Sequence, residues 1–175
     1  MRNTMAQIVD GIDCITAAIG RIATWCALYI VVAEFAVVVL RYVPHVGSIP
    51  LQESVVYAHA GLFMLAAAWT LQVQGHVRVD VFYAQARPRT RALVDLIGAI
   101  IFLLPFAAAL FVLTLPYVER SWLIFEGSPQ PSGIAFVYLL KTTILVFAAL
   151  IGLQGVAQAI RAGLTLSAPA RQQSR

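Results

Sequence analysis

The side chains that most often catalyse reactions or bind metal ions are few in this sequence and are scattered along it. The chain holds three histidines and two cysteines in 175 residues. Haem bound between helices needs facing histidines at matched depth, but only His59 lies in an apolar run, and His45 and His76 lie in separate connecting segments. A thiol redox centre needs a cysteine pair, and the sequence has none. It also has no glycine-rich phosphate loop and no metal-ligand spacing. We therefore expect no catalytic residue, no cofactor and no bound metal ion.

Ionisable side chains do occur inside long apolar runs or at their ends, where a charge is costly. Four residues are of this kind: Glu34, Glu53, His59 and Lys141. In a membrane such groups normally face a bundle interior, a partner or water. We interpret Glu34 as a helix-contact residue, with an ion or proton relay as the alternative. By helical rise Lys141 shares a depth with Glu53 and His59, which predicts a Glu53–Lys141 ion pair; the alternative is that Lys141 reaches the interface alone.

The composition predicts an integral membrane protein. Hydrophobic residues make up 61% of the chain and charged residues 11%, and the mean hydropathy is +0.84. Helices rise about 1.5 Å per residue and the hydrocarbon core is about 30 Å thick, so four apolar runs can span it: residues 22–42, 53–73, 96–118 and 134–160. We predict an all-α protein with a single four-helix membrane domain over residues 1–165 and a disordered tail at 166–175. In the third run Pro105 predicts a kink, because proline removes one backbone hydrogen bond.

Residues 1–20 precede the first apolar run and have a pattern of their own. Isoleucines recur on one helical face at positions 8, 12, 15 and 19, and the polar side chains lie largely elsewhere on the helical wheel. This pattern predicts an amphipathic helix lying in the plane of the membrane interface. Two aspartates before the apolar run argue against a secretory signal.

The positions of the arginines predict the orientation of the chain. With both termini in the cytoplasm, nine arginines lie on the inner side: Arg2, Arg21, Arg78, Arg87, Arg89, Arg91, Arg161, Arg171 and Arg175. Arg41 and Arg120 lie on the outer side. This bias follows the positive-inside rule, and it accounts for the net charge of +4 without a nucleic-acid partner.

Several segments of the chain resemble one family of membrane proteins. These segments are Glu53 through Ala60, the string GHVRVD at residues 75–80, Trp122 with Glu126 in residues 120–129, the approach to Lys141, and Gln154 in the string LQG. In them the chain resembles the small membrane subunit, the Q-type small permease, of TRAP (tripartite ATP-independent periplasmic) transporters. The resemblance covers nearly the whole chain, and GHVRVD is its most specific part.

The resemblance implies an assembly of three proteins at the bacterial inner membrane. A periplasmic substrate-binding protein would deliver an organic acid or related solute, and a large multi-span permease would move it with sodium by an elevator-type motion. This chain would be the non-catalytic subunit that belongs to the static scaffold within the lipid bilayer. Its candidate subunit-interface or structural residues are Glu34, Glu53, His59, His76, Arg78, Asp80, Trp122, Glu126, Lys141 and Gln154.

Two readings of the GHVRVD string and two other functions remain open. Arg78 and Asp80 either fix the inner end of the second run against a neighbour or belong to an ordinary interfacial flank. An autonomous oligomeric four-span channel or carrier should have a continuous polar face across a span, which the third run does not offer. The histidine and cysteine counts argue against a membrane redox enzyme.

Overall fold

All regular elements in the described part of the chain are helices. The computed structural model describes residues 2–76, 83 and 85–167. Its elements are α1 (Arg2–Tyr42), α2 (Ile49–Gln72), α4 (Pro88–Ile97), the π-helix η1 (Gly98–Leu103), α5 (Leu104–Leu123) and α6 (Val137–Leu166). Among the described residues, four helical stretches are long and apolar enough to cross a membrane: Asn3–Tyr42, Ile49–Gln72, Pro88–Leu123 and Val137–Leu166. The all-α prediction and the four candidate spans are confirmed at this level, and the observed helices extend beyond most of the predicted bounds.

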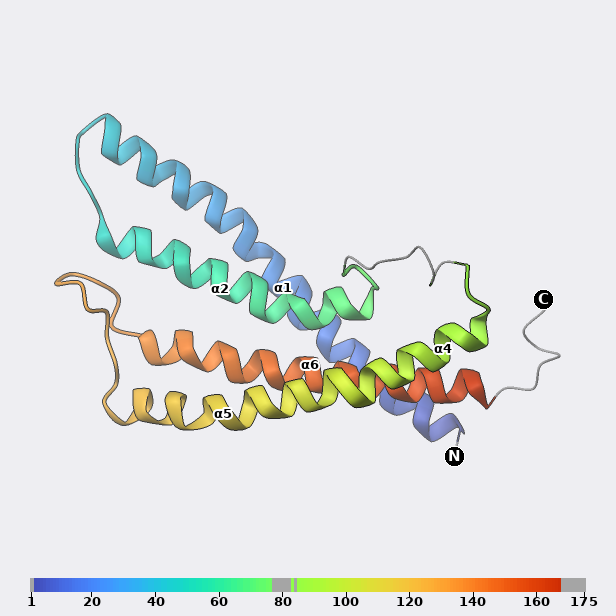
Figure 1. Cartoon of the computed structure of the whole chain (residues 1–175). Coiled ribbons are helices and arrows are strands. Elements are labelled where there is room, and N and C mark those ends of the chain that lie inside the picture. Colours follow the sequence, from blue (N-terminus) through green and yellow to red (C-terminus); the bar gives the residue numbers. More distant parts are fainter. Residues whose placement is uncertain (1, 77–82, 84, 168–175) are drawn as a thin grey trace.

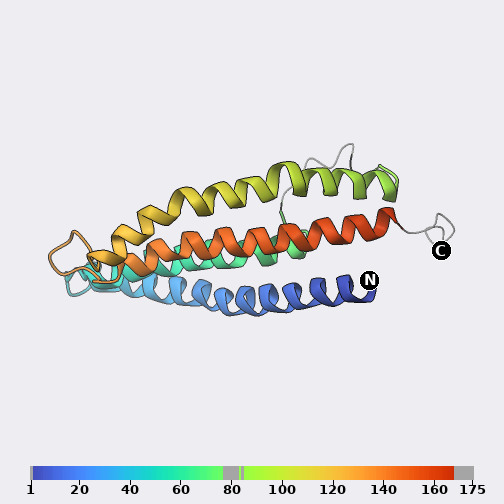
Figure 2. The same ribbon diagram turned by 90° about the horizontal axis from the view of Figure 1, so that it is seen from below.

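Helix α6 is the centre of the bundle. It contacts α1, α2, α4, η1 and α5, and Figure 2 shows α1 and the α4–α5 stretch on opposite sides of it. The start of α1 and the end of α6 lie at one end of the bundle, which we call the terminal end (Figure 1). The connections 43–48 and 124–136 lie at the other end, which we call the loop end.

Small side chains in the bundle let the helices approach closely. The buried core cluster consists of Ala68, Ala107, Leu150 and Ile151. A Cβ atom added to Gly20 of α1 would lie only 2.5 Å from the Trp69 Cβ atom of α2. In a membrane, helix association depends on such close packing, because lipid is as apolar as the side chains and supplies no hydrophobic driving force.

Helix α1 differs from the prediction for the N-terminal segment. Residues 3–20 form the first half of one continuous helix, without the boundary that a separate in-plane helix requires. At about 1.5 Å per residue its 41 residues extend about 60 Å, roughly twice the thickness of a hydrocarbon core. No proline interrupts the junction, and Gly20, which could have ended the helix, is used for the close contact with α2.

The disturbance predicted at Pro105 takes the form of a π-helical turn. Pro105 has no backbone N–H and cannot donate to the carbonyl four residues earlier. The preceding turn, η1, is wide, and the Leu104 N–H donates to the Ala99 carbonyl, five residues back. Helix continues on both sides, so the stretch Pro88–Leu123 remains one candidate span.

Candidate functional site

At the loop end a carboxylate on α2 holds the connection between α5 and α6. Ser48 caps the start of α2 by accepting from the Leu51 N–H at 3.4 Å, and Glu53 follows in the next turn. The Glu53 carboxylate accepts a hydrogen bond from the Ser128 hydroxyl and another from the Ile134 backbone N–H, at 2.6 Å. Glu53 therefore fixes two points of the connection 124–136 against α2.

A second carboxylate at the loop end pairs with the lysine of α6. The Lys141 Nζ atom lies 2.5 Å from Glu126 Oε2 and 4.0 Å from the centre of the Tyr117 ring, within the range of a cation–π interaction. The hydrogen bond from Lys141 holds the pKa of the Glu126 carboxyl below its usual value. The predicted Glu53–Lys141 pair is therefore wrong within this chain: both residues belong to the loop end, but each has another partner.

The chain turn after α5 explains why Glu126 is within reach of Lys141. Phe125 has a left-handed backbone with φ of 46°, and the Glu126 N–H donates to the Ser121 carbonyl at 3.0 Å. This is the Schellman pattern that ends helices, here with phenylalanine where glycine is usual. It reverses the chain and directs the Glu126 side chain toward α6. We call Glu53, Tyr117, Glu126, Ser128 and Lys141 the loop-end cluster.

Trp122 strengthens the same end of the bundle. Its indole N–H donates to Thr142 Oγ1 at 2.9 Å, and its ring meets the Tyr138 ring edge-on at 4.6 Å between centroids. Both contacts join α5 to α6. Tryptophan and tyrosine are enriched where a membrane meets water, which suits this position.

At the terminal end an ion pair joins the first helix to the last. Arg161 of α6 donates to the Asp13 carboxylate of α1, and Gln154 Nε2 donates to the same oxygen at 3.3 Å. Gln154 is only 1% exposed, and its Oε1 atom has no hydrogen-bond partner in the described structure. We call Asp13, Gln154 and Arg161 the terminal-end cluster.

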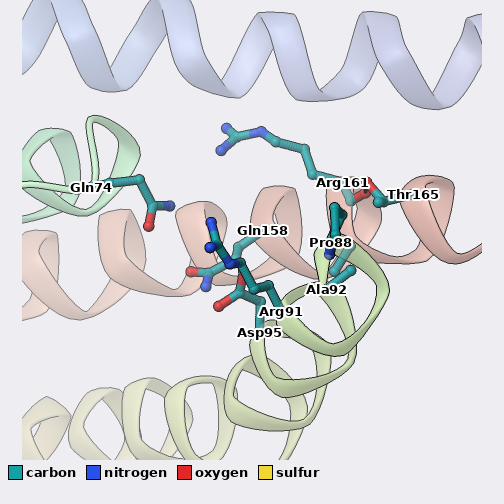
Figure 3. A pocket seen from close by; sticks show the side chains of 9 residues that line it. Gln74, Pro88, Arg91, Ala92, Asp95, Gln158, Arg161 and Thr165 are labelled. Carbon is teal, nitrogen blue, oxygen red and sulfur yellow. Dashed lines mark hydrogen bonds between the residues drawn. The ribbon is translucent and has the colours of Figure 1, made fainter. Parts of the chain in front are cut away.

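A polar cavity of about 290 Å³ lies beside the terminal-end cluster. Its lining residues are Gln74, Pro88, Arg91, Ala92, Asp95, Gln158, Arg161, Ala162 and Thr165. Figure 3 shows Arg91, Asp95 and Gln158 gathered between α4 and α6, with the Arg161 guanidinium extended toward α1. Tyr83 donates to Asp95 at 2.7 Å, and Arg89 donates to the Leu166 carbonyl at 3.4 Å. The charges are mixed and already engaged, which is typical of a structural contact.

The remaining predicted site residues lie apart from the two clusters. His59 is exposed, and its ring lies 4.7 Å from the Phe63 ring. His76 is exposed too, with Nε2 at 3.3 Å from the Ala67 carbonyl oxygen. Glu34 is exposed on α1. Arg78 and Asp80 lie outside the described residues.

The polar side chains of the described residues form contacts between helices and not a cluster typical of a catalytic site. Within them, no group of three or more histidine, cysteine, aspartate or glutamate side chains could hold a metal ion. Cys14 and Cys26 are free thiols. What the polar groups do is join helices: the loop-end cluster links α2, α5 and α6, and the terminal-end cluster links α1 and α6.

Sequence reasoning missed four members of these clusters: Asp13, Tyr117, Ser128 and Arg161. The sequence pattern places Asp13 on the polar side of the predicted in-plane helix, and it indicates for Arg161 only a place among the inner arginines. The two residues are 148 positions apart, and no periodic pattern connects positions so distant. Ser128 lies between a glycine and a proline, and this pattern predicts a tight turn. It does not predict which residue the serine hydroxyl contacts.

Comparison with known proteins places most of the chain in one family. A family model described as the DctQ component of tripartite ATP-independent periplasmic transporters matches residues 30–164. The match includes the whole loop-end cluster together with Gln154 and Arg161, whereas Asp13 precedes it. Searches of curated proteins and of solved structures gave no match.

Proposed function

The chain belongs to the DctQ family, the small membrane component of tripartite ATP-independent periplasmic transporters, and from this premise we propose that it is a static scaffold subunit. In this role it is non-catalytic and lies beside a large elevator-type permease in the bacterial inner membrane. The permease carries out sodium-coupled uptake of an organic acid or related solute, which a periplasmic binding protein delivers. The family match over residues 30–164 is the observation that carries the proposal.

The two polar clusters support a scaffold role. A body against which another protein moves must hold its own helices in fixed positions. Here a hydrogen bond and a cation–π contact join α6 to α5 near the loop end, and an ion pair joins α6 to α1 near the terminal end. Polar contacts between membrane helices contribute about 0.6 kcal/mol each on average and up to about 1.7 kcal/mol. Several such contacts at both ends therefore resist both sliding and splaying of the helices.

The apolar centre of the bundle favours a scaffold over an autonomous channel or carrier. A polar path across the bundle would have to pass between the two clusters. The described core there consists of Ala68, Ala107, Leu150 and Ile151. Charged groups need water or partners along their whole path through a membrane, and this core supplies neither.

The distribution of arginines supports a cytoplasmic terminal end. Arg89, Arg91 and Arg161 lie on elements at the terminal end, whereas Arg41 and Arg120 lie near the loop end. An excess of arginine on the cytoplasmic side is the usual arrangement. The loop end would then face the periplasm, where a binding protein could approach it.

Affinity purification tests the proposed function. The chain is tagged at its C-terminus, extracted from native membranes in mild detergent and captured, and the co-purified proteins are identified by mass spectrometry. We expect one large multi-span permease in near-equal amount, absent from a control with the same tag on an unrelated four-span protein. Recovery of this chain alone, as a uniform oligomer, would contradict the proposal and favour the channel or carrier.

A further inference from the structure

Glu34 differs from the carboxylates of the two clusters in its surroundings. It is exposed on the second half of α1, and Figure 1 shows this half at the edge of the bundle, beside α2. The side chains around it on α1 are apolar and exposed, including Val31 at 67% and Phe35 at 70%. Glu34 is thus a single carboxylate on a face that is otherwise suited to lipid or to another membrane helix.

No described residue of this chain is hydrogen-bonded to Glu34 or forms an ion pair with it. By contrast Asp13, Glu53 and Glu126 each accept a hydrogen bond from a residue that is distant in sequence. A carboxylate at membrane depth is costly unless a donor or cation meets it. Within the described residues, Glu34 therefore has no donor or cation to meet it.

The structure provides a groove at this position. It has a volume of about 480 Å³ between α1 and α2, and its lining residues are Glu34, Val37, Val38, Arg41, Tyr42, Gln52, Val55 and Val56. The walls are mostly valine, with one acid and one base two helical turns apart on α1. Anionic lipid phosphates would be attracted to Arg41, which lies in the last turn of α1, but they are repelled by Glu34. Acyl chains supply no donor. The occupant that matches Glu34 is a membrane helix carrying a lysine or arginine.

We propose that the α1–α2 groove seats a transmembrane helix of the large permease, whose lysine or arginine donates to Glu34. This inference rests on the proposed function and adds to it the face through which the two subunits meet. Charge complementarity selects this groove over the one between α5 and α6. That second groove has a volume of about 560 Å³ and is lined only by apolar side chains, among them Ala108, Val112 and Gly152, so it offers no charge for a partner to recognise.

Photo-crosslinking in the intact complex tests which face meets the permease. A photoreactive amino acid is placed at Val38, in the α1–α2 groove, or at Val112, in the α5–α6 groove; both valines are exposed, at 47% and 66%. We expect the stronger adduct with the large subunit from Val38. An adduct that is equal or stronger from Val112 would overturn the inference, while the proposed function would stand because the complex had formed. Absence of any permease from the purified sample would contradict the proposed function itself.

A charge-removing substitution tests the partner's chemistry. Glu34→Gln should lower the amount of co-purified permease about tenfold, the effect of losing one hydrogen bond to a charged group. Glu119→Gln is the matched control, because Glu119 is an exposed carboxylate on α5, and it should leave co-purification unchanged. The isolated Glu34→Gln chain should be as monodisperse as the parent, since the substitution removes a charge that no described residue pairs with. Equal co-purification of the two variants would overturn the inference.

Discussion

Asp13 links the first half of α1 to α6, and its replacement tests whether the terminal-end cluster stabilises this helix contact. Its carboxylate accepts from both Arg161 and Gln154. In Asp13→Ala, the Gln154 amide loses the acceptor of its Nε2 hydrogen bond. Gln154 is only 1% exposed, and its Oε1 atom already lacks a partner in the described structure. In Arg161→Ala, by contrast, Asp13 keeps the amide of Gln154. The two substitutions should therefore be unequal.

The size of each effect follows from burial. A hydrogen bond to a charged group contributes about 1.5–3 kcal/mol when buried. The side chains of Arg161 and Asp13 are 35% and 25% exposed, which lowers this value through solvent screening. We expect about 1 kcal/mol of destabilisation for Arg161→Ala and about 2 kcal/mol for Asp13→Ala, which also leaves a buried amide unpaired. The coupling in the double variant should be about 1 kcal/mol, within the range measured for membrane helices.

The assay is unfolding of the purified chain by sodium dodecyl sulfate in mixed micelles, followed by circular dichroism. Each single variant and the double variant are compared with the parent chain, so that the coupling energy is obtained directly. Additive effects, or a larger loss for Arg161→Ala than for Asp13→Ala, would refute the proposed geometry of this cluster.

Three further predictions concern the loop end, the helix crossing and the orientation. The lowered pKa of Glu126 means that its pairing with Lys141 stabilises the fold above the ordinary glutamate pKa of about 4.3, and that this stability is lost as the pH falls through the lowered value. Glu126→Gln should remove that part of the acid sensitivity in the same unfolding assay; an unchanged pH dependence would contradict the pairing. Gly20→Ala should destabilise the folded chain by about 1–3 kcal/mol, because the added Cβ would overlap Trp69 of α2. Gly163→Ala, with open space around it, should be neutral or stabilising by up to about 1 kcal/mol. Equal effects of the two substitutions would show that α1 and α2 do not cross closely at Gly20. In a chain whose two cysteines have been replaced, Ser132→Cys should react with a membrane-impermeant maleimide added outside whole spheroplasts. An introduced thiol that does not react would contradict the proposed orientation.

The apolar runs predicted the class of the fold and the number of candidate spans because a membrane restricts helices to a narrow range of length and composition. The prediction failed for contacts between two helices and between a helix and a loop. Helical rise places Lys141 and Glu53 at the same depth, but it gives no position for Glu126, which is not on a helix. That residue lies in a connection whose path depends on the left-handed turn at Phe125.

The N-terminal segment shows a second limit of sequence reasoning. The isoleucine pattern in residues 1–20 suggested an independent interfacial helix, whereas the structure continues it into the first span. The decisive interactions are the Gly20 contact with Trp69 and the Asp13 contact with Arg161. Both involve residues that are distant in sequence, and a periodicity within twenty residues contains no information about them.

Native mass spectrometry of the assembly captured from membranes is the strongest test that this chain is a permease subunit. We predict a complex in which one copy of this 19.0 kDa chain is bound to one copy of a larger permease, and activation in the gas phase should release the two as separate masses. An assembly whose mass is a whole multiple of 19.0 kDa, with no second kind of subunit, would contradict the proposed scaffold role.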